Sequence, residues 1–446
     1  MAKAKSKQAD DQGVILVGAA KQEINPPVDV EFLIYPDYAA GPRPYAGVES
    51  DLYARAAVFG DAASGRPAAA LVVLDNLYVH PEIAAAVRER AARAVPGLPV
   101  DAVMVAATHT HSAPPLIPFD MGGGGWQGRT VLLRKGQTQT PGDTLAHPDP
   151  EYVEKVKAAG AQAVARAWAA RHAVRARAGL AEARLAHNRR VVDQDGRASN
   201  EWLDPAGRHV GFFSPNLRFV VFEDARTGAV RTIIAGYGCH PVTWGPQGGK
   251  PSPDYCGHFM TNIEAATGAE TALCLTTGGG ETNPRVGLAD NNAATIAMAK
   301  TLAEKLLAAL PGAQPLDLGP IAAARVALEL SLRNEMGKGP ARLLLGRVQA
   351  GDKTVATEVQ ALRLGDLAFV SAPGELFSEI AVKLENCSPV PYTIVVGHAN
   401  DAIGYLFPDH AIPEGGYEVV NGSACTTVER PYIEAALKAL AEARNK

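Results

Sequence analysis

Residues 100–112 read VDAVMVAATHTHS, a run of small and apolar residues that ends in two histidines. The run from Val100 to Ala107 is typical of a strand that is buried on both faces. Side chains two positions apart in an extended segment point to the same side, so we expect His109 and His111 to project together from the strand end. α/β proteins bind their ligands at such ends. Two imidazoles there suit a zinc ion. One ligand with one general base, or two structural histidines in a turn, would give the same pattern.

Short apolar runs alternate with amphipathic stretches along the chain, which indicates an α/β protein. The predicted strands are Gly13–Ala19, Leu52–Phe59, Ala68–Leu74, Val100–Ala107, Phe219–Phe222, Thr232–Gly236, Ala272–Leu275, Ala361–Leu364 and Ala368–Val370. Apolar residues recur every three or four positions in the predicted helices Pro81–Val95, Glu151–Arg171, Asn291–Leu310 and Thr427–Ala441. Residues 35–50 and 112–150 are predicted to be loops. No repeat or linker divides the chain.

Four further segments with reactive side chains follow apolar strands. They are Cys239-His240-Pro241, residues 276–285 with three consecutive glycines, Pro373-Gly374-Glu375, and residues 397–405, which end in Tyr405. A single histidine is more often structural than a ligand. Glu375 would suit the start of a following helix, where its charge favours the helix dipole. The glycine run lacks the GK[ST] ending of a P-loop, which argues against nucleotide binding.

Composition narrows the class of protein. The 446 residues include 43 Lys and Arg against 47 Asp and Glu, with 47% hydrophobic and 20% charged residues, as in soluble globular proteins. A net charge of −4 and 6% aromatic residues argue against a nucleic-acid partner. The five cysteines are scattered and form no CxxC, so neither a disulfide framework nor a zinc finger is expected.

The ends and the hydropathy suggest a location. Residues 1–12 are polar, are followed by no apolar signal segment, and are predicted to form a flexible leader. No run approaches the roughly 18 apolar residues of a membrane span. We therefore expect a cytoplasmic protein without stable membrane association.

The order of these motifs resembles the neutral/alkaline ceramidases, a family of zinc-dependent amide hydrolases. The matching segments are residues 17–20, 24–27, 52–56, 108–112 (THTHS), 240–241 (HP), 280–284, 373–375 (PGE) and 400–405. The resemblance implies one catalytic domain over residues 13–446, with mixed β-sheets and flanking helices. It also implies that the additional C-terminal β-rich domain of ceramidases is absent.

The resemblance also implies a metal site. One zinc ion would be held by His109, His240, Glu375 and Tyr405. His111 would stand beside the metal, either as a residue that supports the ligands or as an acid/base residue, and Arg189 resembles an arginine that lines the site. Such a zinc leaves room for water and a substrate carbonyl, and lowers the pKa of the water toward ~7. His111, Tyr405 or N–H groups of the glycine run would stabilise the oxyanion.

One position departs from the family pattern. Ceramidases carry a serine in a Gly-Asp-x-Ser-Pro-Asn stretch, and Asn283 occupies that place here. An asparagine can donate a hydrogen bond but cannot act as a nucleophile. Hydrolysis by a metal-activated water survives this change, whereas any role of the serine hydroxyl is lost.

Three functions compete. The first is a zinc-dependent hydrolase that uses a metal-activated water on an amide, or a related carbonyl bond, of a small soluble substrate. The second is a true ceramidase, which would need residues 112–150 or Pro36–Tyr45 to form an apolar tunnel. The third is a non-catalytic, zinc-stabilised binding protein. A homo-oligomer is compatible with all three, and Asp75, Asp254 and His258 are open candidates for the site.

Overall fold

The structure is a computed structural model. It describes residues 13–27, 30–35, 43–44, 47–116, 119–120, 129–134, 145–146, 148–244, 250–288, 291–332, 347–348, 352–420 and 425–445. The predicted leader, residues 1–12, lies outside the described residues, as do parts of the two predicted loops.

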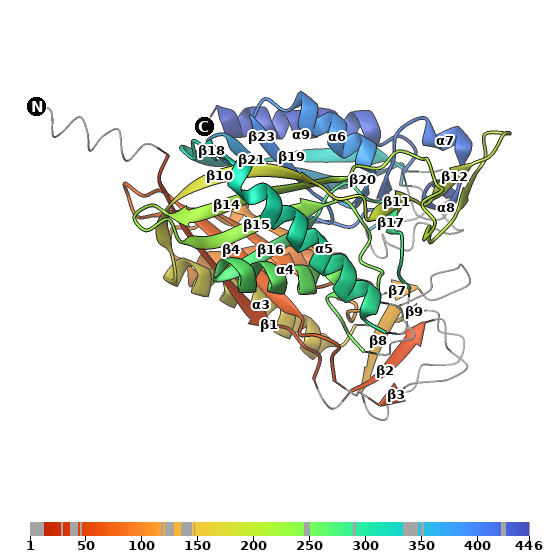
Figure 1. The fold of residues 1–446 in the computed structure, drawn as a ribbon, viewed down its shortest axis with the longest axis horizontal. Helices are drawn as coiled ribbons and strands as arrows, with labels where there is room; N and C mark the ends of the chain where they lie inside the picture. The colour runs from red at the N-terminus through yellow and green to blue at the C-terminus, as the bar shows by residue number, and fades with distance from the viewer. Residues whose placement is uncertain are drawn as a thin grey trace, which may run out of the picture.

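The largest sheet has nine strands (Figure 1). They are β1 (Ile15–Glu23), β4 (Tyr53–Gly60), β5 (Pro67–Leu74), β6 (Val103–Ala107), β10 (His172–Glu182), β14 (Asn216–Asp224), β15 (Val230–Tyr237), β16 (Thr271–Thr276) and β18 (Gln314–Leu316). The order is β16-β15-β14-β10-β1-β4-β5-β6, and β18 pairs with β10. Two pairs are parallel, β5 with β6 and β15 with β16, and the rest are antiparallel. The helices α2 (Pro81–Ala94) and α4 (Asp254–Thr267) connect the parallel pairs.

A second sheet has the order β19-β20-β21-β23. Its strands are β19 (Ile321–Ser331), β20 (Thr354–Leu364), β21 (Leu367–Ser371) and β23 (Tyr392–Val396). The last two are parallel, and α6 (Ser378–Cys387) connects them. The remaining helices are α3 (Pro150–Ala169), α5 (Ala293–Ala309), α7 (Ala411–Glu414), α8 (Tyr417–Val420) and α9 (Glu429–Arg444).

Short strands form small additional sheets. They are β2 (Val30–Tyr35), β3 (Arg43–Pro44), β7 (Phe119–Asp120), β8 (Arg129–Arg134), β9 (Leu145–Ala146), β11 (Ala186–Asn188), β12 (Arg190–Val192), β13 (Ala198–Asn200), β17 (Thr282–Pro284), β22 (Glu375–Leu376) and β24 (Tyr405–Leu406). The pairs β11–β17 and β22–β24 lie next to the candidate site, as described below.

The two large sheets pack face to face and helices cover their outer faces, which gives four layers (Figure 1). Phe59 of the large sheet stacks on Phe369 of the second sheet, with 6.2 Å between ring centroids. Alternate residues of β4 face opposite layers: Ala56 and Val58 pack against α2 and α3, whereas Phe59 packs between the sheets. This follows from the two-residue period of a strand.

Helix α3 shows how the local sequence sets an element. The side chain of Asp149 accepts a hydrogen bond from the N–H of Tyr152 at 2.8 Å, and Pro150 occupies the first turn. Its buried face is rich in alanine, which allows close packing on β1. A Cβ atom on Gly18 would lie 1.9 Å from the carbonyl oxygen of Ala167, so this contact requires glycine.

The four predicted helices are confirmed as α2, α3, α5 and α9, with ends that differ by a few residues. Strand β6 begins at Val103 rather than Val100, because residues 100–102 form a 3₁₀ turn. The predicted loops are also partly wrong: residues 112–150 include β7, β8 and β9, and residues 35–50 include β3.

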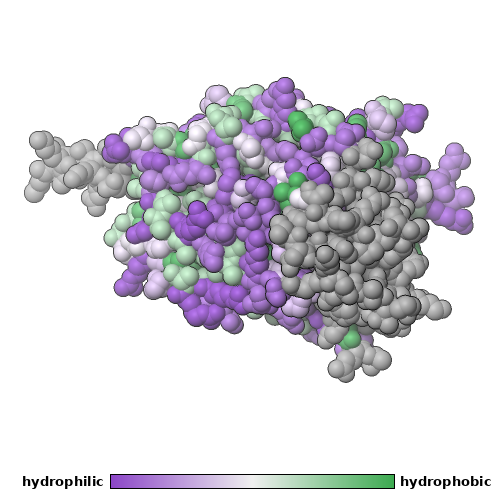
Figure 2. Space-filling model, turned by 90° about the horizontal axis from the view of Figure 1, so that it is seen from below, coloured by the Kyte–Doolittle hydropathy of each residue, from purple (hydrophilic) through white to green (hydrophobic). Residues whose placement is uncertain are grey.

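Among the described residues, none of the helices combines the length and the apolar character that a bilayer span requires. On the face drawn in Figure 2, the described residues are mostly hydrophilic, and hydrophobic residues are scattered among them.

Candidate metal centre

The segments that follow the parallel strands of both sheets meet in one place. After β6, the carbonyl of Thr108 accepts a hydrogen bond of 2.7 Å from the hydroxyl of Thr276, at the end of β16. Ala399, which follows β23, forms a β-bridge with Ala106 of β6. Ala372, which follows β21, donates to the carbonyl of Val396, at 2.7 Å. The strand ends where α/β proteins bind ligands therefore converge here.

Three histidines from these segments form one cluster. The ring nitrogens that His109, His111 and His240 can offer to a metal all lie within 4.8 Å of one another. The Nε2 atoms of His109 and His111 are 3.4 Å apart, so the two do project together as predicted. His109 and His240 are buried, whereas His111 is partly exposed.

Backbone carbonyls fix the tautomers of the two buried histidines. Nδ1 of His109 lies 2.9 Å from the carbonyl oxygen of Leu77, and Nδ1 of His240 lies 3.0 Å from those of Gly279 and Thr282. Because a carbonyl oxygen only accepts, each Nδ1 donates and each Nε2 of a neutral ring keeps its lone pair. Burial, together with the charge of Arg189, lowers the pKa of His240 to about 4, so this ring is neutral near pH 7.

Glu375 completes the cluster. Its Oε2 lies 3.1 Å from Nε2 of His240 and 3.5 Å from Nε2 of His109, and its Oε1 accepts a hydrogen bond of 2.6 Å from the hydroxyl of Tyr78. Two imidazole lone pairs thus face a carboxylate, a donor set that fits zinc. The carbonyls on Nδ1 and the hydroxyl of Tyr78 are the orienting partners that zinc ligands require.

The expectation that Glu375 opens a helix is wrong. Glu375 lies in β22, where it pairs in parallel with Tyr405 of β24, and helix α6 begins only at Ser378. The carboxylate at the start of α6 is instead that of Glu281, which accepts from the N–H of Ser378 at 3.0 Å. The strand pairing comes from a segment thirty residues further along, which local sequence does not reveal.

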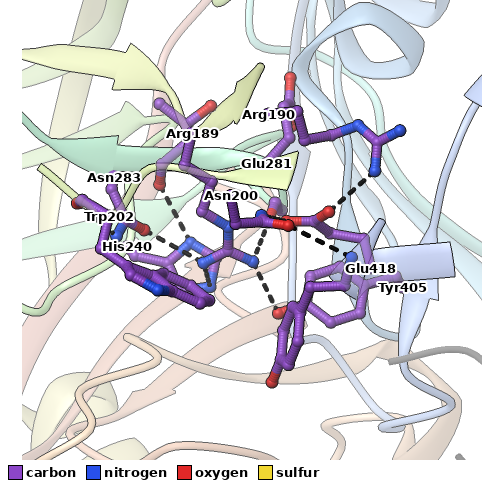
Figure 3. Close-up of polar contacts among 12 residues, drawn as sticks. Arg189, Arg190, Asn200, Trp202, His240, Glu281, Asn283, Tyr405 and Glu418 are labelled. Carbon is purple, nitrogen blue, oxygen red and sulfur yellow. Dashed lines mark hydrogen bonds and ion pairs between the residues drawn. The ribbon is translucent and has the colours of Figure 1, made fainter. Parts of the chain in front are cut away.

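Arg189 lies against His240, one member of the cluster (Figure 3). Its side chain is almost fully buried. Its Nη1 is 3.4 Å from Nε2 of His240, and its Nε donates to Glu418 at 2.7 Å. Nη2 donates to the hydroxyl of Tyr405 and to the carbonyl of Gly280, both at 2.9 Å. Burial opposes its charge, but Tyr405 and Glu418 raise the pKa of Arg189 above its ordinary value. The guanidinium is therefore a fixed positive charge beside the histidines.

Asn283 and Tyr405 both contact Arg189. Oδ1 of Asn283 accepts from Nη1 of Arg189 at 3.1 Å, and its Nδ2 donates to the carbonyl of Trp202 at 3.0 Å. Asn283 therefore links Arg189 to the segment after β13. Burial and the charge of Glu375 raise the pKa of Tyr405 well above its usual value, so its hydroxyl keeps its proton. Tyr405 pairs with Glu375 in the β22–β24 register, and it stays a candidate fourth ligand.

The glycine run has a packing role. The N–H groups of Gly279 and Gly280 both donate to the carbonyl of Leu376 at 2.8 Å, so these two amides are not available to an oxyanion or a phosphate. A Cβ atom on Gly280 would lie 2.6 Å from the carbonyl oxygen of Glu375. The glycines let the strand ends that carry the site approach closely, and the expectation that these two amides stabilise an oxyanion is wrong.

The three open candidates have other partners in the described part of the chain. Asp75 accepts from the N–H of Tyr53 at 2.9 Å, and Asp254 accepts from the N–H of Trp244 at 2.8 Å at the start of α4. His258 pairs with Glu49 at 3.0 Å. These contacts organise the segments around the site.

The Glu49–His258 pair predicts a pH dependence of stability. The hydrogen bond to Glu49 raises the pKa of His258 above its usual value, so its contribution is complete below about pH 6.5 and is lost as pH rises through the folded-state pKa. Burial alone would raise the pKa of Glu49, but its donors lower it overall. Its contribution is therefore complete above about pH 4.3 and is lost as pH falls through the folded-state pKa. The pair stabilises most between these limits.

A double-mutant cycle with His258→Gln and Glu49→Gln tests this in urea unfolding. We expect a coupling free energy of about 0.5–1 kcal/mol near pH ~5.5, and a smaller one near pH ~9. Equal coupling at the two pH values would contradict the assignment.

Sequence reasoning missed two contributors, Tyr78 and Glu418. Tyr78 lies four residues beyond the end of β5 and reaches Glu375 across 297 positions. Glu418, in the four-residue helix α8, reaches Arg189 across 229 positions. Neither residue belongs to a motif, and only the tertiary contacts give them a role.

Comparison with solved structures identifies the fold. No protein-family model and no curated protein matches the sequence. The structure of neutral ceramidase from Pseudomonas aeruginosa matches with a TM-score of 0.72 at 19% identity, over 96% of this chain and 73% of that one. The chain has the fold of the neutral ceramidases. A ceramidase solved in complex with C2 matches with a TM-score of 0.70 at 18% identity, over 96% of this chain and 74% of that one.

The neutral-ceramidase fold confirms the α/β class with mixed sheets and flanking helices, and it confirms the resemblance at the level of the backbone. At 18–19% identity the side chains of the site have to be argued from this chain's own contacts.

Proposed function

We propose that the protein is a zinc-dependent hydrolase that cleaves an amide, or a related carbonyl bond, of a small soluble substrate. The observation that carries this proposal is the donor set of His109, His240 and Glu375, in which two ring lone pairs and a carboxylate oxygen face one another. Their outward atoms are all bonded to carbonyls or to the hydroxyl of Tyr78. Such preorganised donors favour a divalent cation.

These three residues would hold the metal, with Tyr405 as the fourth ligand. When bound there, zinc would supply Lewis acidity, which polarises a carbonyl group and lowers the pKa of a water molecule. The fold supports amide chemistry, because the solved structures that share it are ceramidases. A small soluble substrate, no nucleic-acid partner, a cytoplasmic location and a homo-oligomer are parts of the same proposal.

His111 is the proposed acid/base residue. It is the partly exposed member of the histidine cluster, so substrate and water reach it most easily. In the proposed reaction it takes a proton from the attacking water while a C–O bond forms at the carbonyl carbon. It then returns the proton to the leaving nitrogen as the C–N bond breaks. Proton transfer of this kind is worth about 10²–10⁴-fold in rate.

Arg189 and Asn283 complete the proposed machinery. The guanidinium beside His240 would stabilise negative charge on the substrate's carbonyl oxygen through its positive charge, because its N–H groups already face protein acceptors. Asn283 accepts from Nη1, the same nitrogen that lies beside His240, and offers no hydroxyl nucleophile. We therefore expect water to attack the carbonyl carbon directly, with no covalent intermediate on Asn283.

The test combines metal analysis with a substrate panel. We expect about one zinc per chain by elemental mass spectrometry, and turnover of soluble amides that a chelator abolishes and zinc restores. His111→Ala should keep zinc and lose about 10²–10⁴-fold in kcat. The control variant is His410→Ala, a surface histidine paired with Glu379.

Each other outcome has a meaning. Fatty acid release from ceramide-containing vesicles, with no turnover of soluble amides, would favour the lipid amidase. Bound zinc with no turnover of amides, esters or lactones would favour the binding protein. Absence of zinc uptake would reject the proposal.

A further inference from the structure

His398 occupies an unusual place beside the histidine cluster. Its φ of 52° lies in the left-handed region, and its side chain is buried. The backbone joins two strand ends: its carbonyl accepts from the N–H of Ala107 and its N–H donates to the carbonyl of Gly374, both at 3.1 Å. These neighbours precede His109 and Glu375 by two residues and one residue. His398 therefore lies between the segments that carry two of the proposed ligands.

The ring of His398 lies flat on that of His109. The centroids are 3.7 Å apart and the planes differ by 12°. His111 and His240 instead meet His109 edge-on, at 83° and 67°. Nδ1 of His398 is buried without a hydrogen-bond partner among the described residues, so this nitrogen does not account for the presence of a histidine.

The backbone conformation makes a histidine at position 398 harder to explain. Glycine adopts a positive φ without a Cβ penalty, whereas a histidine there is strained. Strained residues persist where the surroundings over-determine them, and they cluster at functional sites. The two backbone hydrogen bonds explain how the conformation is held. They do not explain why the residue carries a ring.

We propose that His398 is a positioning residue that fixes the ring plane of His109 and thereby increases the zinc affinity of the site. A flat neighbour at 3.7 Å restricts rotation of the His109 ring, so less freedom is lost when its Nε2 binds a cation. A ring that binds a cation also becomes electron-poor, and the π face of His398 attracts it. The inference rests on the proposed zinc site and adds a residue to it.

The test measures zinc affinity by competition with a chelating dye, on protein stripped of metal, for wild type and three variants. His398→Gly and His398→Ala remove the ring, and glycine also relieves the backbone strain. His398→Phe keeps a flat ring without nitrogens. We expect about 10–100-fold weaker zinc binding for Gly and Ala, the range known for partners that orient zinc ligands, and near wild-type affinity for Phe.

A second readout is the visible spectrum of the Co²⁺-loaded protein, which reports ligand geometry. It should change in the Gly variant and stay close to wild type in the Phe variant. Tight zinc binding by the Gly variant, or binding by the Phe variant as weak as that of Gly, would overturn the proposal. A wild-type chain that binds no zinc would overturn both this inference and the proposed function. Equal affinities in all four proteins would overturn this inference alone.

Discussion

His240→Ala is expected to abolish zinc binding and zinc-dependent hydrolysis. The ring supplies one of the two lone pairs that face Glu375, and the variant has no atom that can replace it. Loss of a partner that only orients a ligand weakens metal binding by about 10–100-fold, so loss of a ligand should exceed that range. Elemental mass spectrometry after dialysis should give about one zinc per wild-type chain and almost none in the variant.

Stability has to be measured alongside, because His240 is buried. Its removal takes the Nδ1 donor from the carbonyls of Gly279 and Thr282. Each carbonyl keeps a backbone N–H donor, so the lost hydrogen bond should cost about 0.5–1.5 kcal/mol. Added zinc should raise the melting temperature of wild type and of the surface variant His172→Ala, but not that of His240→Ala. A folded His240→Ala protein with a full zinc complement would exclude this residue as a ligand.

The sequence predicted part of this site, and the structure explains why the rest could not be predicted. The Nε2 atoms of His109 and His111 do meet, as the spacing predicted, but His109 has a φ of 67° and the segment after β6 is not extended, so the two-residue period of a strand is not the reason. The sequence alone left His240, Glu375 and Tyr405 ambiguous, and the family resemblance named them. Their meeting depends on how strands from two sheets are placed, which no spacing within one segment encodes.

The fold shows the same limit. Helices with a regular apolar stripe, such as α3, were predicted within a few residues. The strands β10 and β19 were missed although buried and exposed residues alternate along them. They consist largely of Ala, Arg, Leu and Glu, which favour helices, so composition and pattern disagree. Neighbouring strands decide the outcome in favour of β structure.

Arg189→Met is expected to reduce both stability and activity. The guanidinium of Arg189 and the carboxylate of Glu418 are almost completely buried, and they form an ion pair in which Nε and Oε1 are 2.7 Å apart. Removing one partner of a buried pair costs about 3–5 kcal/mol, because the other charge and its hydrogen-bonding groups lose their compensation. Here Tyr405 and Asn283 would lose the same donor. Loss of the positive charge of Arg189 near the substrate's carbonyl oxygen should lower kcat by about 10²–10³-fold.

Two companion variants separate these effects. Arg190 binds the other oxygen of Glu418 at 2.9 Å and is equally buried, so Arg190→Met should destabilise the fold to a similar degree. Because no contact joins Arg190 to the histidine cluster among the described residues, kcat per folded molecule should change little. In the double variant Arg189→Met with Glu418→Gln, the buried carboxylate is neutralised, so stability should partly return while kcat stays low.

Urea unfolding gives the stability of each variant, and kcat is measured on protein with a confirmed zinc content. If Arg189 acts only as a structural ion pair, kcat should follow stability in all three variants, and Arg190→Met should be as impaired as Arg189→Met. If Arg189 stabilises charge in the reaction, kcat should fall in Arg189→Met and change little in Arg190→Met. Both arginines are bound to one carboxylate, but only Arg189 has a nitrogen 3.4 Å from Nε2 of His240. That asymmetry makes these two adjacent residues, at the junction of β11 and β12, matched probes, one for the reaction and one for the fold.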